Sequence, residues 1–393
     1  MCYKIFCISL RQKFVIMNIV ENPFLTVGYV SKEYFCDREY ELKVLKSNIV
    51  NGINTTLIST RRFGKSALIQ RLFDEFDPQK YVCIYVDVYS CINLKDFTET
   101  LALSIFNKFP EKRGIGRRFL DFLKTLRPVI SYDPLNGQPK ILFDFIQPKE
   151  YEHTLRSLFY FLDNQQMQIA LAIDEFQQIA EYPEKNIEAL LRTIIQTLKK
   201  TNFIFSGSKK SMMLEMFNTA NRPFFASTQI IGLAEIPQDK YKAFIGEKFK
   251  ARRRSITDEA IDFILSWTLT HTYYTQAVCN AIFADGKKKV GIETVKRVCD
   301  ELLSLQQANF MQYRNLLSPL QWQLLIAIAK EGVVTEPQSQ SFLRKYKVGA
   351  ASSARKALLA LVEKEMVCTI ESKEKTAYRV YNVFLMRWME RTF

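Results

Sequence analysis

The sequence has few residues of the types that hold transition metals, and it lacks long apolar runs. Among 393 residues it has only 2 histidines, His153 and His271, and its 8 cysteines are scattered without a C-x-x-C pair. This pattern argues against a zinc site and favours reduced thiols in the cytoplasm. Lys4, Arg11 and Lys13 interrupt the apolar opening, which falls short of the ~18 apolar residues of a membrane span. We therefore expect a cytoplasmic protein that does not contact membranes.

Residues 1–30 are predicted to form an extension ahead of the folded core. A secretory signal would need a small-residue cleavage site after the apolar stretch, and none follows. A start at Met17 is the simpler explanation, because the recognisable pattern described below begins close to it.

The composition is that of a globular protein with a basic surface. Hydrophobic residues make up 48% and charged residues 24% of the chain, which is ordinary for a folded protein, and the length suggests two or three domains. The formal net charge is +14, and the excess is spread along the chain. Such a charge permits an anionic partner, above all nucleic acid, without identifying one.

Residues 31–235 are predicted to form one domain, and from residue 51 the sequence alternates short β-rich runs with helical periods, as βαβ units with a parallel sheet do. The expected strands are 55–59, 81–88, 168–174, 202–207 and 228–233. The expected helices are 65–76, 95–108, 151–163, 186–200 and 209–218. Residues 110–149 interrupt this alternation and are predicted to be an insertion. Their basic run "EKRGIGRRFLDFLKTLR" fits a solvated helix face better than a nucleic-acid contact, which is the alternative.

The remainder of the chain is predicted to form two further parts. Residues 236–311 contain amphipathic helices, and their basic runs "ARRRS" and "KKK" are expected to be solvated surface. From residue 312 the order is helix 319–331, a short polar segment, helix 349–366 and two short strands, which is the order of a winged helix-turn-helix.

The stretch "STRRFGKSA" matches most of the phosphate-binding pattern G-x-x-x-x-G-K-[ST]. In such a loop, backbone N–H groups at a helix start converge on an anion, while the lysine reaches the β- and γ-phosphates. The serine at the first glycine position is tolerated if its dihedral angles stay in an allowed region. The candidate nucleotide-binding residues are Ser59, Thr60, Arg61, Arg62, Phe63, Gly64, Lys65, Ser66 and Ala67.

A second part of the candidate site is the acidic pair that ends the strand "QIALAID". Asp174 and Glu175 stand at the carboxyl end of this strand, where ligands bind in parallel α/β sheets. Asp174 and Ser66 are predicted to hold Mg²⁺, and Glu175 to orient and deprotonate the attacking water, with Lys65 also catalytic. The alternative is a solvated strand end that caps the next helix. In "FIFSGS", Ser206 or Ser208 could sense the γ-phosphate, and an ordinary helix cap is the alternative.

With these motifs the chain resembles the archaeal-type P-loop ATPases of the STAND branch of AAA+ proteins, over residues 20–393. "YFCDREYELKVL", "STRRFGKSALI" and "LAIDEFQQIAEY" carry the resemblance. It implies an α/β P-loop NTPase sandwich of three layers with a parallel sheet at 31–235, a helical lid at 236–311 and a winged helix-turn-helix at 312–393. It also implies that ATP and Mg²⁺ are the cofactors.

The resemblance assigns further residues to the nucleotide site. Phe35 and Arg38 correspond to an aromatic and an arginine that shape the adenine pocket, and His271 belongs to a lid motif that closes over the base. That motif, "THTYYTQ", departs from the family's G-H-P-Y-Y-L-Q by losing its glycine and proline, which puts lid closure in question. Arg222 is the only arginine near the position of a further family element, and no arginine finger is assigned.

Two functions remain open at this point. One is an ATP hydrolase that works as a nucleotide-driven switch. The other is a regulator with little turnover that binds DNA or protein through the winged helix, with Ser352, Ser353, Arg355, Lys356, Lys373 and Lys375 as candidate DNA contacts and Glu371 and Glu374 opposing them. Some members of the family carry a nuclease-like domain after the winged helix; the sequence lacks its acidic cluster, so nuclease activity is not expected.

Overall fold

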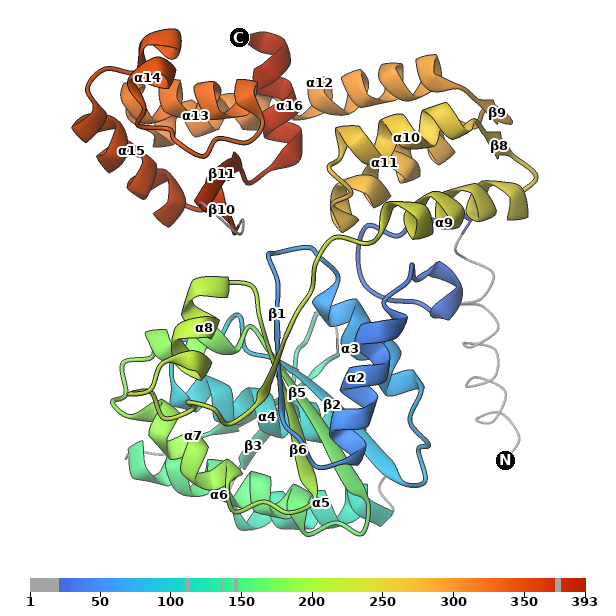
Figure 1. Ribbon diagram of the computed structural model, residues 1–393. Coiled ribbons are helices and arrows are strands. Elements are labelled where there is room, and N and C mark those ends of the chain that lie inside the picture. Colours follow the sequence, from blue (N-terminus) through green and yellow to red (C-terminus); the bar gives the residue numbers. More distant parts are fainter. Residues whose placement is uncertain (1–20, 110–113, 127, 136, 145–147, 372–375) are drawn as a thin grey trace. The chain divides into compact units, whose positions relative to one another are not determined.

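The computed structural model describes residues 21–109, 114–126, 128–135, 137–144, 148–371 and 376–393. The chain divides into two compact units (Figure 1). One is Val27–Glu235, and the other joins Ile236–Phe393 to the segment that ends at Thr26. Met17, the alternative start, lies outside the described residues, as do Lys373 and Lys375.

The unit Val27–Glu235 is built on a parallel sheet of five strands in the order β2-β5-β6-β1-β7 (Figure 1). This confirms the predicted α/β class and its parallel sheet. Because all the strands point the same way, their carboxyl ends meet at one edge. The strands are β1 (Thr55–Ile58), β2 (Tyr81–Asp87), β5 (Gln168–Asp174), β6 (Thr201–Gly207) and β7 (Gln229–Gly232).

Helices cover both faces of this sheet, and the residues of β5 alternate between the two faces. Ile169, Leu171 and Ile173 join one core cluster, while Ala170 and Ala172 join the other. This is the period-two alternation of a strand buried on both faces. The Ala face is covered by α2 (Glu39–Val50) and α3 (Lys65–Asp74). The Ile face is covered by α4 (Leu94–Lys108), α6 (Pro148–Asp163), α7 (Ile187–Ile195) and α8 (Lys210–Asn218).

The insertion contains more regular structure than the sequence analysis predicted. Helix α5 (Gly114–Thr125) is followed by β3 (Pro128–Tyr132) and β4 (Pro139–Phe143), which pair as an antiparallel hairpin. The proline and glycine content concealed this hairpin, because a proline begins each strand and further proline and glycine residues lie between the strands. Helix α5 buries Phe119 and leaves Arg117 75% exposed. Its basic residues therefore lie on a solvated face, as the sequence pattern indicated.

The second unit begins with a helical part that also holds residues from before the sheet. Phe24 is 1% exposed and packs against Phe244, Phe249 and Phe283. The helices are α9 (Gln238–Ala251), α10 (Asp258–Trp267), α11 (Thr272–Ala284) and α12 (Ile292–Leu316), and the short strands are β8 (Ser255–Ile256) and β9 (Lys289–Val290). The parallel pairing of β8 with β9 brings the two basic runs of this region side by side.

The C-terminal part of this unit is a winged helix, as predicted. Its elements are α13 (Pro319–Glu331), α14 (Gln340–Tyr346), α15 (Ala351–Glu363), β10 (Val367–Glu371), β11 (Thr376–Val380) and α16 (Val383–Thr392). Helix α16 joins it to the helical part: Phe384 contacts Tyr274 at 4.8 Å between ring centroids, and Arg387 Nε donates to Trp267 O at 2.9 Å. Among the described residues, no helix is both long and apolar enough to cross a membrane.

Candidate active site

The loop between β1 and α3 has the backbone that a phosphate loop needs. Strand β1 ends at Ile58 and α3 begins at Lys65. Between them Gly64 has φ 94°, a left-handed conformation that favours glycine. Ser59, at the position of the missing glycine, has no positive φ. Its side chain therefore causes no backbone strain, and the departure from the pattern is compatible with the loop geometry.

Lys65 lies at the centre of this loop and is 5% exposed. Its Nζ donates to Ser59 O and Ser59 Oγ at 3.3 Å each and to Thr60 O at 3.4 Å. Burial lowers the pKa of the ammonium below its usual value, while the negative charges of Glu175 and Asp174 act in the opposite direction. The protein thus buries a cation that neutral loop atoms contact directly, which leaves its charge available to an anionic ligand.

Asp174 is 4% exposed at the end of β5 and is the acceptor for three hydroxyl groups. Ser66 Oγ donates to Oδ2 at 2.6 Å, Tyr85 OH also donates to Oδ2, and Ser206 Oγ donates to Oδ1. The Glu175 N–H donates to Oδ1 as well, at 3.0 Å. These donors come from α3, β2 and β6, so three elements must be in place to orient the one carboxylate.

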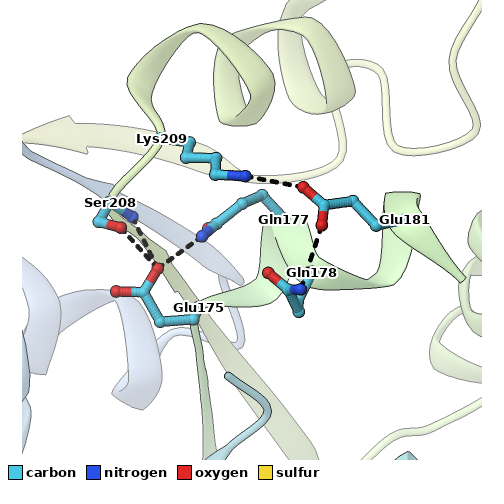
Figure 2. A network of polar contacts seen from close by, with 6 residues as sticks. All are labelled: Glu175, Gln177, Gln178, Glu181, Ser208 and Lys209. Carbon is cyan, nitrogen blue, oxygen red and sulfur yellow. Dashed lines mark hydrogen bonds and ion pairs between the residues drawn. The ribbon is translucent and has the colours of Figure 1, made fainter. Parts of the chain in front are cut away.

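Glu175 follows Asp174 with φ 55°, so the chain turns sharply where the strand ends. Its Oε2 accepts hydrogen bonds from Gln177 Nε2 at 2.5 Å, Ser208 Oγ at 2.7 Å and Ser208 N at 3.3 Å (Figure 2). The two serines considered from the sequence therefore have separate partners: Ser206 contacts Asp174, and Ser208 contacts Glu175. The interpretation of Asp174 as a freely solvated strand end does not fit this geometry.

Two residues of β2 belong to this edge although the sequence analysis did not assign them. Tyr85 reaches Asp174, and burial is the main cause that raises the pKa of its hydroxyl. Asp87 lies opposite Asp174 in the β2–β5 register, and burial also raises the pKa of its carboxyl. The signal for Asp87 was its position at the end of a predicted strand. Tyr85 had no such signal, because its contact depends on which strand is the neighbour of β5.

The other predicted site residues are more dispersed. Arg38 is 4% exposed and donates to Glu41 Oε1 at 2.8 Å and to Ala234 O at 2.6 Å, so it joins the segments by which the chain enters and leaves this unit. The guanidinium of Arg71 lies 4.9 Å from the centroid of the Phe35 ring. Phe63 is buried, Thr60, Arg61 and Ala67 are half-buried, and Arg62 is exposed with φ 64°.

His271 belongs to the other compact unit. It precedes α11, is 6% exposed, and lies 4.6 Å from Tyr274 between ring centroids. Arg222, the arginine near the position of the further family element, pairs with Glu188 at 2.9 Å and with Glu215 at 3.7 Å. Its guanidinium is thus held by carboxylates of its own unit.

A parallel sheet covered on both faces, with a glycine-lysine-serine loop after β1 and an acidic pair after β5, defines a P-loop ATPase fold. The family described as "ATPase domain predominantly from Archaea" matches residues 35–272, and a "Probable winged helix domain" matches residues 308–391. The first match covers more than half of the 393 residues, so the chain belongs to this archaeal-type ATPase family. A search of curated proteins found no match. Membership of the STAND branch and a cytoplasmic location stay predictions.

Solved structures show the same fold over almost the whole chain. A Walker-type ATPase of Pyrococcus abyssi is 17% identical, with a TM-score of 0.64 over 93% of this chain and 99% of that one. The Aeropyrum pernix ORC2 protein, solved in ADPNP–ADP complexes, is 13% identical, with a TM-score of 0.53 over 92% and 95%. The A. pernix ORC1 protein, solved with DNA, is 11% identical, with a TM-score of 0.51 over 95% and 97%.

Proposed function

We propose that this protein is a Mg²⁺-dependent ATP hydrolase whose nucleotide cycle switches the position of its second unit. The observation that carries the proposal is the meeting of Ser66, Asp174 and Glu175 with Lys65 at one edge of the sheet. The 2.6 Å hydrogen bond from Ser66 to Asp174 joins the end of the phosphate loop to the acidic pair. Membership of an ATPase family and the fold shared with nucleotide-bound proteins support the same conclusion.

The proposed reaction is attack of water on the γ-phosphorus of ATP. A bond forms between the water oxygen and phosphorus, and the bond from phosphorus to the bridging oxygen breaks, which releases ADP. Glu175 accepts the proton of the water, a role that a positioned carboxylate performs. Lys65 and the N–H groups that begin α3 stabilise the negative charge on the phosphates.

The donors present fit Mg²⁺, which prefers oxygen ligands and is commonly held by one or two protein groups together with phosphates. Ser66 Oγ and Asp174 Oδ2 are both oxygen donors, and at 2.6 Å from one another they are close enough to serve one ion. We propose that these residues hold the ion directly or through water. When bound, Mg²⁺ supplies positive charge that offsets the phosphate charge.

Phosphate release from ATP by the wild type and two variants tests the hydrolase. Glu175→Gln keeps the size of the side chain but removes the base, so nucleotide binding should persist while kcat falls by roughly 10² to 10⁴-fold. Lys65→Ala removes a charged phosphate contact, so binding itself should weaken. Unchanged turnover in both variants would contradict the proposal that the protein is an ATP hydrolase that uses this site.

The switch is supported by how the chain is divided. It passes between the units at Thr26–Val27 and at Glu235–Ile236. Within the second unit, Phe384 and Arg387 of α16 contact Tyr274 and Trp267 of the helical part, which favours movement of this unit as one body. Small-angle scattering with and without a non-hydrolysable ATP analogue tests this. A radius of gyration that does not respond to the analogue at saturation contradicts the switch.

A second function, duplex DNA binding through the winged helix, is favoured by one face of α15. Ser352, Ser353, Arg355 and Lys356 are all exposed, whereas the opposite face is buried in the domain core. Among the described residues neither Arg355 nor Lys356 is in an ion pair, so both cations are available to phosphates or base edges. The paired basic runs near β8 and β9 add positive charge to the same unit.

Binding of duplex DNA at two salt concentrations, with and without ATP, tests this second function. Phosphate contacts release counterions, so the affinity should fall steeply as salt rises. An affinity that does not change with salt, or no binding at low salt, would contradict DNA binding. A protein partner would then be favoured as the ligand of the winged helix. Measuring ATP turnover in the same samples shows whether DNA stimulates hydrolysis.

A further inference from the structure

We infer that Gln177 is a positioning residue for Glu175, and that Gly207 is needed because it leaves room for the Gln177 side chain. The inference rests on the proposed function, in which Glu175 accepts the proton of the attacking water. It concerns how the carboxylate is aimed, and neither residue is proposed to contact the nucleotide.

Gln177 is held firmly where it can act on Glu175. It lies in the short 3-10 helix η2 (Phe176–Glu181) and is 1% exposed. Its Nε2 donates to Glu175 Oε2 at 2.5 Å (Figure 2). The amide must present its nitrogen here, because its oxygen at this distance from a carboxylate would be repelled. Its own Oε1 is buried and, among the described residues, has no hydrogen-bond partner.

An unsatisfied buried oxygen normally destabilises a protein. The orientation of Gln177 therefore has a cost that its bond to Glu175 must offset. A hydrogen bond to a charged group is about twice as strong as one between neutral groups. This accounts for the orientation in which the amide nitrogen of Gln177 faces Glu175. The amide is thus fixed by the carboxylate it contacts rather than by a network of its own.

Gly207, the last residue of β6, makes this placement of Gln177 sterically feasible. A Cβ at Gly207 would come within 3.0 Å of Gln177 Oε1 and of Met213 Sδ and Cγ, closer than real Cβ atoms approach other heavy atoms. Its φ is not positive, so backbone conformation is not what calls for glycine. Lack of space is the reason, and the groups that occupy the space are the Gln177 amide, which contacts Glu175, and the Met213 side chain.

The contacts on Glu175 are unequal between its two oxygens. Oε2 accepts all three hydrogen bonds, two from Ser208 and one from Gln177. Among the described residues, no protein group donates to Oε1. One oxygen therefore anchors the carboxylate and the other remains as the acceptor for the water proton. Proton transfer needs the base within hydrogen-bond distance of the proton. The hydrogen bonds to Oε2 fix the position of Oε1 and therefore its distance from that proton.

The test compares Gln177→Ala with Gln178→Ala. Gln178 is a matched control in the same helix, because its Nε2 donates to Glu181 at 3.2 Å and not to Glu175 (Figure 2). We expect Gln177→Ala to lower kcat by roughly 10 to 100-fold, the worth of a hydrogen bond to a charged group. The KM for ATP and the affinity for a fluorescent ATP analogue should not change. Gln178→Ala should resemble the wild type in every measurement.

The difference between the effects on kcat and on binding separates positioning from a general structural role. A disturbed fold should weaken binding of the ATP analogue as well, whereas loss of the Gln177 bond to Glu175 should lower kcat alone. Gly207→Ala should displace the amide, together with Met213, and should lower kcat without changing Gln177 itself. Combining Gly207→Ala with Gln177→Ala should lower kcat by no more than the larger single change.

The outcomes distinguish this inference from the proposed function. A wild type that releases no phosphate overturns the proposed function and the positioning role together. If the wild type turns over and Glu175→Gln does not, an unchanged kcat in Gln177→Ala overturns the positioning role alone. Equal losses of kcat and analogue binding in the Gln177 and Gln178 variants also overturn it, since they indicate a disturbed fold.

Discussion

The carboxyl edge of the sheet and the exposed face of α15 are both candidate binding sites, but they are built in opposite ways. At the sheet edge, most of the polar groups are buried and contact one another: the Asp174 carboxylate alone accepts hydrogen bonds from three elements. On α15, Arg355 and Lys356 are exposed side chains of a single helix. The first site depends on the whole fold of its unit, and the second depends mainly on which residues the helix carries.

The difference predicts how each site responds to substitution. A change at the sheet edge alters contacts that are preorganised in a buried environment, so it should affect chemistry and folding stability together. A change on the α15 face should alter affinity for a partner and its salt dependence, and little else. Four variants sharpen this comparison, from the largest expected effect to the smallest.

Lys65→Met should have the largest effect: it should weaken ATP binding but raise folding stability. Loss of the ammonium should weaken ATP binding by roughly 10 to 100-fold. Since burial lowers the Lys65 pKa in the folded state, the folded protein binds this proton less tightly than the unfolded chain does. Folding stability attributable to Lys65 is therefore lowest well below the folded pKa and rises with pH between the folded and unfolded values.

The measurement is the thermal midpoint of the nucleotide-free protein against pH. Lys65→Met should melt higher than the wild type at neutral pH, and this gain should shrink as pH rises through the lowered pKa of Lys65. A variant that melts at a lower temperature than the wild type at every pH contradicts the claim that burying the ammonium lowers folding stability.

Arg355→Ala combined with Lys356→Ala should come next if the winged helix binds DNA. Each lost phosphate contact should reduce the slope of log affinity against log salt by about 1, which titrations at several salt concentrations measure. ATP turnover without DNA should match the wild type. A control with the same loss of charge, Lys32→Ala with Lys43→Ala, removes exposed cations from the other unit. If the slope falls equally in this control, the effect of the α15 substitutions is due to the loss of net charge and not to contacts made by that helix.

Ser318→Ala should have a smaller effect that is confined to the winged helix. Ser318 caps α13: its Oγ accepts from Gln321 N at 3.3 Å, and Gln321 Oε1 accepts from Ser318 N at 3.0 Å. Loss of such a cap costs about 1 kcal/mol, measured by denaturant unfolding. ATP affinity should stay at the wild-type value, and a reduced affinity would show that the two sites are not independent.

Arg391→Ala should have the smallest effect. Arg391 pairs with Asp300 at 2.8 Å, but the two side chains are 42% and 61% exposed. Exposed pairs contribute roughly 0 to 1 kcal/mol, so the unfolding midpoint should barely move. A loss as large as that of Ser318→Ala would mean that this pair, which joins α16 to α12, is more important to the unit than its exposure indicates.

Most of the fold could be predicted from local patterns. The strand at 168–174 and the helix at 319–331 have the predicted bounds, because hydrophobic periodicity and capping residues act over a few positions. The β3–β4 hairpin was missed because a proline begins each strand and the segment is rich in proline and glycine, a composition typical of irregular structure. Strand order was also not predicted, since it is a choice among distant segments that local pattern does not encode.

The candidate site follows the same division. The sequence by itself determined which groups are proposed for the site, Lys65, Ser66, Asp174 and Glu175, because a phosphate loop and a strand-end acidic pair are short contiguous motifs. Only the tertiary structure decided which side chains hold them. Tyr85, Gln177 and Gly207 become relevant through contacts across β2, η2 and β6. Such contacts depend on packing between segments that are far apart in the chain, and no local pattern specifies that packing.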